Sequence, residues 1–232
     1  MPDYGRIYQT EAERYHRLVS REDYEGNLLN TIAQIRPLTE QTVVEFGAGT
    51  GRLTTMLAPQ IKQLFAFDNS QHMLQTALTN LQASGLRNWH LAVSDNRHIP
   101  LQSHVADITI AGWSFGHSIG WYPKFWKRVV GSMILEMKRL LKSGGTIIII
   151  ETLGTGREDP QPPSLYLENY YHWLETEWQM STTWVRTDYL FHSVAEAEEL
   201  TRFFFGENMA DEVVDKEMTL LPECTGFWWM TV

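Results

Sequence analysis

The stretch Val43-Val44-Glu45-Phe46-Gly47-Ala48-Gly49-Thr50-Gly51 decides how this chain folds. A short apolar run, typical of a buried strand, leads directly into glycines at alternating positions. Because glycine has no Cβ, the backbone at such a turn can approach a ligand closely and present its N–H groups to it. An acidic residue, Asp68, follows the next apolar run. The pattern predicts a strand-to-helix turn that holds a cofactor.

Outward from this turn, apolar segments of strand length alternate with amphipathic segments of helix length. The predicted strands are Thr42–Phe46, Gln63–Phe67, Trp89–Val93, Asp107–Ala111, Thr146–Ile150, Thr182–Phe191 and Gly226–Val232. Helices are predicted within residues 10–36, where Ser20-Arg21-Glu22-Asp23 has the spacing of a capping box, along Met73–Leu81 and Phe125–Leu140, and over Ser164–Glu177 and Ser193–Phe205. This alternation predicts an α/β fold with a mostly parallel sheet that binds ligands at the carboxyl ends of its strands.

The composition of the chain disfavours several classes of protein. The chain has 232 residues, and its 19 Lys and Arg against 28 Asp and Glu give a net charge of −9, which disfavours nucleic acid as a partner. A single cysteine, Cys224, excludes an internal disulfide and suits a reducing compartment. No apolar run is long enough to span a membrane, and no histidines pair at metal-ligand spacing. We therefore expect a cytoplasmic protein with no membrane partner and no bound metal.

The spacing of the glycines separates two classes of cofactor. A dinucleotide site requires G-x-G-x-x-G, but here the third glycine comes one residue early and Arg52 occupies the position expected for it. The form E-x-G-x-G-x-G resembles the first motif of the class I S-adenosylmethionine-dependent methyltransferases. Further motifs of that family follow in order: Phe67-Asp68-Asn69-Ser70 leading into Met73, Ser94-Asp95-Asn96, and Leu140-Leu141-Lys142-Ser143-Gly144-Gly145-Thr146, in which Ser143 replaces the usual proline.

The resemblance implies a Rossmann-like fold with a seven-stranded, mostly parallel sheet, an antiparallel last strand and helices on both faces. It also implies that S-adenosylmethionine binds and that S-adenosylhomocysteine is the product. Asp68 is expected to receive the ribose hydroxyls and Asp95 the adenine amino group. The residues expected to bind the cofactor are Glu45, Phe46, Gly47, Ala48, Gly49, Gly51, Asp68, Asn69, Met73, Ser94, Asp95, Asn96 and Gly112.

Residues on the acceptor side are harder to assign. His117 follows the fourth strand and is a candidate general base, although packing in a loop explains it as well. Trp113, Tyr166, Tyr170 and Tyr171 are candidates for substrate binding, and helix packing is their alternative interpretation. We expect one domain over 1–232, with helices in 1–36 over the cofactor and a substrate lid in 152–181. Tyr8 and Tyr15, seven residues apart, are interpreted as a packing stripe on one helix.

The expected activity is transfer of a methyl group to a small-molecule O or N acceptor by direct in-line displacement. No Asn-Pro-Pro-Tyr or Asp-Pro-Pro-Tyr element follows the fourth strand, which disfavours methylation of DNA bases. Two alternatives stay open, a non-catalytic S-adenosylmethionine-binding protein and an NAD-dependent oxidoreductase. The protein is expected to be a monomer or a homodimer.

Overall fold

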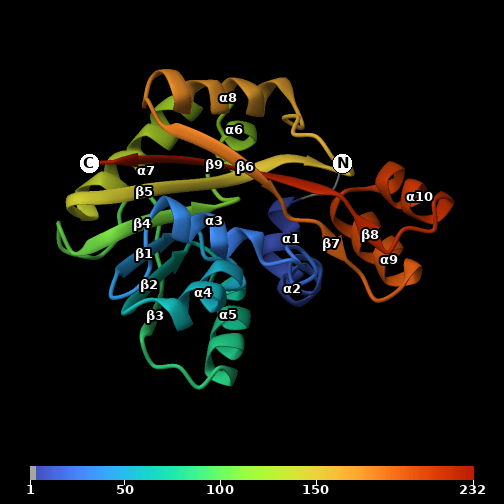
Figure 1. The fold of residues 1–232 in the computed structure, drawn as a ribbon, viewed down its shortest axis with the longest axis horizontal. Coiled ribbons are helices and arrows are strands. Elements are labelled where there is room, and N and C mark those ends of the chain that lie inside the picture. The colour runs from blue at the N-terminus through green and yellow to red at the C-terminus, as the bar shows by residue number, and fades with distance from the viewer. Residues whose placement is uncertain (1–3) are drawn as a thin grey trace.

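The structure, a computed structural model, describes residues 4–232 of the chain. Residues 1–3, the beginning of the predicted segment 1–36, lie outside the described part. Three short helices come first: α1 (Tyr4–Thr10), α2 (Ala12–Val19) and α3 (Asn27–Ile35). Strands and helices then alternate along the chain (Figure 1).

Seven strands form the main sheet in the order β3-β2-β1-β4-β5-β9-β6. They are β1 (Thr42–Phe46), β2 (Gln63–Asp68), β3 (Trp89–Val93), β4 (Ala106–Gly112), β5 (Leu141–Thr155), β6 (Ser181–Arg186) and β9 (Glu223–Thr231). The first five strands pair in parallel, whereas β9 is antiparallel to β5 and β6. The predicted sheet with its antiparallel last strand is confirmed.

Helices cover both faces of this sheet (Figure 1). Along β1, Val44 and Phe46 pack in the apolar core under α6 (His117–Trp121), α7 (Trp126–Leu140) and α8 (Leu165–Thr176). Val43 points to the opposite face, which is covered by α3, α4 (Arg52–Leu57), the 3₁₀ turn Ala58–Gln60 and α5 (Gln71–Ala83). Both faces of the strand are thus buried, which is why its sequence is almost continuously apolar.

The strand order reverses between β1 and β4, the two central neighbours. In open sheets of this kind the crossovers on either side of such a point diverge and leave a crevice at the carboxyl ends of the strands. The glycine turn after β1, the end of β2 and the loop after β4 all lie at this edge.

A smaller unit follows β6 and packs against the N-terminal helices. Its two-stranded sheet pairs β7 (Tyr189–Leu190) with β8 (Leu220–Leu221), and its helices are α9 (Val194–Phe204) and α10 (Glu207–Asp215). Leu18 of α2 belongs to the apolar cluster of this unit. In Figure 1 the unit lies at one end of the molecule, beside α1 and α2.

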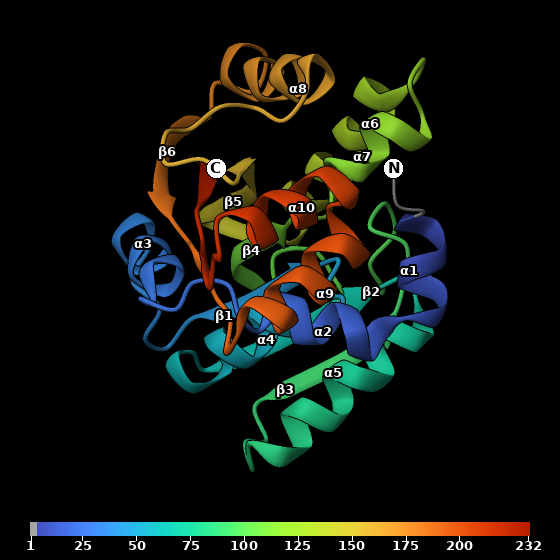
Figure 2. The ribbon, with the colours of Figure 1, turned by 90° about the vertical axis from the view of Figure 1, so that its right-hand side faces the viewer.

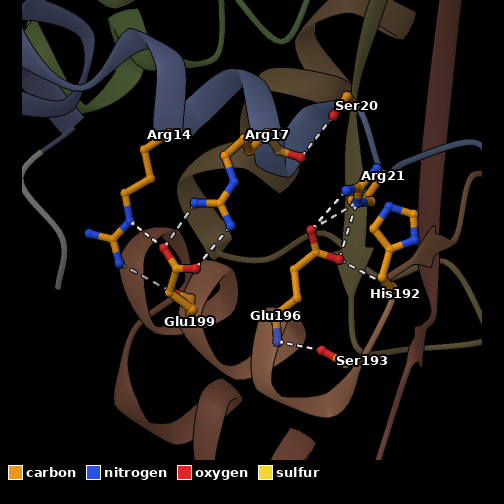
Figure 3. A network of polar contacts seen from close by, with 8 residues as sticks. All are labelled: Arg14, Arg17, Ser20, Arg21, His192, Ser193, Glu196 and Glu199. Carbon is orange, nitrogen blue, oxygen red and sulfur yellow. Dashed lines mark hydrogen bonds and ion pairs between the residues drawn. The ribbon is translucent and has the colours of Figure 1, made fainter.

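Ion pairs join the N-terminal segment to α9 (Figure 3). Arg14 and Arg17 both bind Glu199, with N–O distances of 3.2 and 3.0 Å. Arg21 binds Glu196 through two nitrogens, the shorter contact being 2.8 Å. We call these contacts the α2–α9 clasp, because they fix the N-terminal helices to an element almost 180 residues away along the chain.

The structure corrects two sequence predictions. The strand predicted over 182–191 divides into β6 and β7, because after Arg186 the chain leaves the main sheet and pairs with β8. Ser20 ends α2 instead of capping a helix start, and its hydroxyl donates to the Arg17 carbonyl. Asp23 is the residue that stabilises the start of α3, because its carboxylate accepts from the N–H groups of Asn27 and Leu28. Helix α10 was not predicted.

Candidate active site

The glycine turn after β1 has a backbone that only glycine accommodates. Gly47 has a φ of +73°, and a Cβ built on it would lie 2.0 Å from Ser114 Oγ. The N–H groups of Gly47 and Ala48 both donate to the Phe67 carbonyl at 2.8 and 2.9 Å, which ties the turn to the end of β2. Gly51 serves a different purpose, because its Cβ position is 3.0 Å from the Cβ of Ala77 and its bare backbone lets α5 pack closely.

Asp68 ends β2 and faces the same turn. Its carboxylate accepts from the Gly49 N–H and the Ser70 N–H, both at 2.8 Å. Burial raises the pKa of this carboxyl, while the backbone donors oppose the shift. The two oxygens together have about four lone pairs, so the backbone donors of Gly49, Ser70 and Asn69 still leave acceptor capacity for a ligand hydroxyl.

Glu45 is the second acid of the site. It is buried, and its carboxyl accepts from Thr54 Oγ1 at 2.7 Å. Burial raises its pKa to about 8, with a smaller contribution from the negative charge of Asp68. A cationic ligand group nearby would favour the ionised form of this carboxyl and lower its pKa.

On the other side of the turn, Asp95 and Asn96 follow β3. Asp95 binds the guanidinium of Arg97 through both oxygens, at 2.9 and 2.5 Å, and this contact lowers the pKa of the carboxyl. Asn96 Nδ2 donates to Ser114 Oγ at 3.2 Å, directly over Gly47. Its Oδ1 is buried and has no hydrogen-bond partner among residues 4–232, so it is a free acceptor for a ligand N–H.

At the far end of the site, His117 is the first residue of α6. The Tyr8 hydroxyl lies 2.9 Å from His117 Nε2, and the backbone carbonyl of Trp113 accepts a hydrogen bond from the same ring. With Nδ1–H directed to this carbonyl, Nε2 is free to accept from Tyr8. Burial lowers the His117 pKa to about 4, so the ring is neutral at physiological pH.

Aromatic rings surround this histidine. Trp121 stacks on it at a centroid distance of 5.4 Å, and Tyr8 contacts it edge-on at 5.2 Å. Tyr15 packs against Tyr8 at 5.4 Å. The two tyrosines come from different helices, because the chain breaks between α1 and α2 at Glu11. The prediction that they share one helical face is therefore wrong.

One cavity of about 180 Å³ connects these groups, more than ten times the roughly 10–15 Å³ that a buried water needs. The predicted residues that line it are Glu45, Gly47, Ala48, Gly49, Asp68, Asn69, Met73, Asp95, Asn96, Gly112, Trp113 and His117. Those outside the lining are Phe46, Gly51, Ser94, Tyr166, Tyr170 and Tyr171. Tyr170 and Tyr171 are buried in the core under α8, whereas Tyr166 is exposed.

Sequence reasoning missed much of the lining. The additional residues are Tyr8, Tyr15, Thr50, Arg52, Leu53, Ser70, Arg97, Ser114, Ser118, Trp121, Tyr122, Val129 and Met133. Arg52 could have been predicted as a site residue, because it directly follows the glycine motif. It lies 4.1 Å above the Trp113 ring and pairs with the buried Glu22 at 2.6 Å. Within residues 4–232, no cluster of three potential metal ligands is found, and no helix is long and apolar enough to cross a membrane.

Comparisons with known proteins agree with this arrangement. The model of a methyltransferase domain family matches residues 43–145, the segment that carries all the motifs above. The uncharacterized protein YafE of Escherichia coli K12 is 28% identical over 110 residues, which cover 47% of this chain and about half, 49%, of YafE. An uncharacterized methyltransferase of Geobacillus sp. strain WCH70 is 28% identical over 160 residues, which cover 66% of this chain and 68% of that protein.

The fold is similar to that of solved methyltransferases. The crystal structure of an S-adenosylmethionine-dependent methyltransferase from Aquifex aeolicus has a TM-score of 0.57 at 18% identity, over 88% of this chain and 89% of that one. The family match, the ordered motifs and the strand order all lead to the same assignment. Residues 43–145 match a methyltransferase domain, and the whole chain has a fold similar to that of solved S-adenosylmethionine-dependent methyltransferases.

Proposed function

We propose that this protein transfers a methyl group from S-adenosylmethionine to a hydroxyl or amino group of a small molecule. The observation that carries the proposal is that one cavity joins the glycine turn and Asp68 at one end to the Tyr8–His117 hydrogen bond at the other. One end has the groups that a nucleoside requires, and the other has a base.

The residues present fit the cofactor. Gly47 leaves bare backbone where a side chain would obstruct the cavity. Asp68 has free lone pairs for ribose hydroxyls, and Asn96 Oδ1 is an unpartnered acceptor for an N–H of the adenine ring. Glu45, with its raised pKa, would ionise in response to the cofactor's positive charge. When bound, S-adenosylmethionine supplies a methyl group already activated by its sulfonium.

His117 and Tyr8 are proposed to manage the proton of the acceptor. Positive charge develops on the acceptor atom as the methyl group arrives, so its proton becomes acidic and even a base of low pKa can take it. Nε2 would receive a proton while the Trp113 carbonyl holds the ring orientation. The Tyr8 hydroxyl occupies Nε2 in this structure, so the acceptor proton would pass to the Tyr8 oxygen while Tyr8 gives its own proton to Nε2.

A small acceptor fits the surroundings better than a polymer. Tyr8 and Tyr15 line the cavity from the N-terminal helices, and ordering the acceptor inside such a site can contribute about 7–11 kcal/mol to a two-reactant step. The net charge of −9 opposes a phosphate backbone. The lining is largely aromatic at the acceptor end, which suits an apolar or flat molecule.

The test is a search for methylated product. The protein would be incubated with a metabolite extract and isotopically labelled S-adenosylmethionine, and products carrying the label would be identified by mass spectrometry. We expect a labelled small molecule that disappears with the His117→Ala variant. Tight binding of S-adenosylhomocysteine without any product would favour a regulatory binding protein, and thermal stabilisation by NAD alone would refute the proposal.

A further inference from the structure

A short segment at the edge of the cavity carries exposed aromatic side chains. It is Trp121-Tyr122-Pro123-Lys124-Phe125-Trp126-Lys127-Arg128, from the end of α6 to the first turn of α7. Trp121, Tyr122 and Phe125 are 52%, 43% and 64% exposed. Trp121 and Tyr122 also line the cavity, so this segment forms part of its mouth. In Figure 2, α6 and the start of α7 lie at the outer edge of the molecule.

The first turn of α8 carries two further exposed apolar side chains. Leu165 and Tyr166 are 68% and 71% exposed. They lie near α6, because Leu167 in the same turn approaches the Cβ position of Gly116 to 3.3 Å. We call Trp121, Tyr122, Phe125, Leu165 and Tyr166 the aromatic rim. Single exposed apolar residues are ordinary, whereas five on neighbouring elements are a candidate interaction surface.

The charge beside the rim is opposite to that of the whole chain. Lys124, Lys127 and Arg128 lie within the eight residues 121–128, which contain no acid. Lys127 pairs with Glu177 at 2.6 Å. Among the residues that the structure describes, Lys124 and Arg128 have no ion-pair partner. An acidic protein of net charge −9 therefore presents unpaired cations and aromatic rings together at the mouth of its cavity.

We propose that the aromatic rim docks the protein on an anionic lipid bilayer. Trp and Tyr have an apolar body and a polar tip, which suits the boundary between headgroups and acyl chains. Flanking lysine and arginine side chains are attracted by anionic headgroups, whereas the acidic remainder of the surface is repelled. Pro123 lies between α6 and α7, so Tyr122 and Phe125 of the rim are on a short loop. Such docking requires no membrane-spanning helix.

The experiment is co-sedimentation of the full chain with vesicles of phosphatidylcholine alone and of phosphatidylcholine mixed with phosphatidylglycerol. Binding is expected only to the mixed vesicles and should weaken as salt is added. Arg128→Glu should lower the affinity at least about fivefold, the factor expected per basic residue at an anionic surface. Phe125→Ser should lower it about tenfold, because an inserted ring is lost. Neither residue lines the cavity, so cofactor affinity should stay unchanged and report an intact fold.

Matched controls are available elsewhere on the surface. Arg87→Glu makes the same charge change at an exposed site without an ion pair among residues 4–232, and Leu135→Ser removes an apolar side chain that is 59% exposed on α7. Both controls should bind vesicles like the parent protein. Failure of the parent to bind mixed vesicles, or equal losses in Arg87→Glu and Arg128→Glu, would overturn the proposal. Self-association without vesicles that Phe125→Ser abolishes would also overturn it and assign the rim to a second copy of the chain.

Discussion

The two ends of the cavity are built in different ways. The end at the glycine turn is formed mainly by backbone and short side chains that follow β1, β2 and β3 within residues 45–97. The end at His117 is formed by aromatic side chains from α1, α2 and α6. Those of α1 and α2 lie more than 100 positions before those of α6 in the sequence. The first end is therefore as rigid as the sheet, whereas the second depends on how the N-terminal helices dock.

The strongest test of the rigid end is Gly47→Ala. The added Cβ would meet Ser114 Oγ at 2.0 Å, so we expect affinity for S-adenosylhomocysteine to fall at least about 100-fold, or about 3 kcal/mol. Calorimetry measures the affinity of each variant for S-adenosylhomocysteine. Gly85→Ala is the matched control, because Gly85 has a similar φ of +71° but nothing within 4 Å of its Cβ position. Equal effects of the two substitutions would show that backbone strain alone is responsible.

At the other end, the pH dependence of stability probes the burial of His117. Its pKa of about 4 in the folded protein lies below the ordinary value of 6.5. The unfolded chain therefore binds a proton more readily, and folding stability is lost as the pH falls from about 6.5 to 4, by up to about 3 kcal/mol. Urea unfolding at several pH values should show this loss, and His117→Gln should flatten the curve. An unchanged slope in the variant would place the titration elsewhere.

Asp68→Asn removes the charge that we assign to ribose binding but keeps the shape of the side chain. Loss of a hydrogen bond to a charged group costs about 1.5–3 kcal/mol, so cofactor affinity should fall roughly 10- to 150-fold. Asp107→Asn serves as the control, because Asp107 also accepts a backbone N–H, that of Thr42, at the opposite end of the sheet. Unchanged calorimetric affinity in Asp68→Asn would remove this residue from the site.

Tyr8→Phe tests whether the two ends of the cavity contribute separately to turnover and to cofactor affinity. It removes the hydroxyl that contacts His117 Nε2 and keeps the ring, so turnover should fall about fivefold, or roughly 1 kcal/mol, at unchanged cofactor affinity. Tyr24→Phe removes a hydroxyl that contacts only Glu25 at the surface and should have no effect. If Tyr8→Phe weakened the cofactor instead of turnover, the tyrosine would belong to the rigid end.

The smallest expected effect concerns the α2–α9 clasp. Arg21→Gln breaks a partly buried, bidentate contact with Glu196 and should destabilise the fold by about 0.5–1 kcal/mol, less at high salt. Lys216→Gln breaks an exposed pair with Glu212 at the end of α10 and should cost less. Protease sensitivity of the N-terminal helices should increase only in Arg21→Gln, and equal sensitivity in both variants would contradict a role for the clasp.

The difference between the two ends of the cavity also explains which parts of the site could be predicted from the sequence. The strands, the glycine turn and Asp68 depend on spacing over about 25 residues, and β1 and β3 have the predicted bounds. Tyr8 reaches His117 across 109 positions, and no local pattern encodes such a contact. Tyr170 and Tyr171 resemble lid residues in the sequence but pack in the core, because periodicity places a ring on a helix face without saying what that face covers.

The clasp has a consequence for synthesis on the ribosome. Tyr8 and Tyr15 emerge early, yet the helices that carry them are anchored by Glu196 and Glu199, which are translated near the end. A nascent chain should therefore acquire its cofactor-binding core before the wall over His117 is fixed. Stalled chains whose emerged part stops before residue 194 should leave residues 4–20 open to proteolysis, and chains whose emerged part extends past residue 204 should protect them.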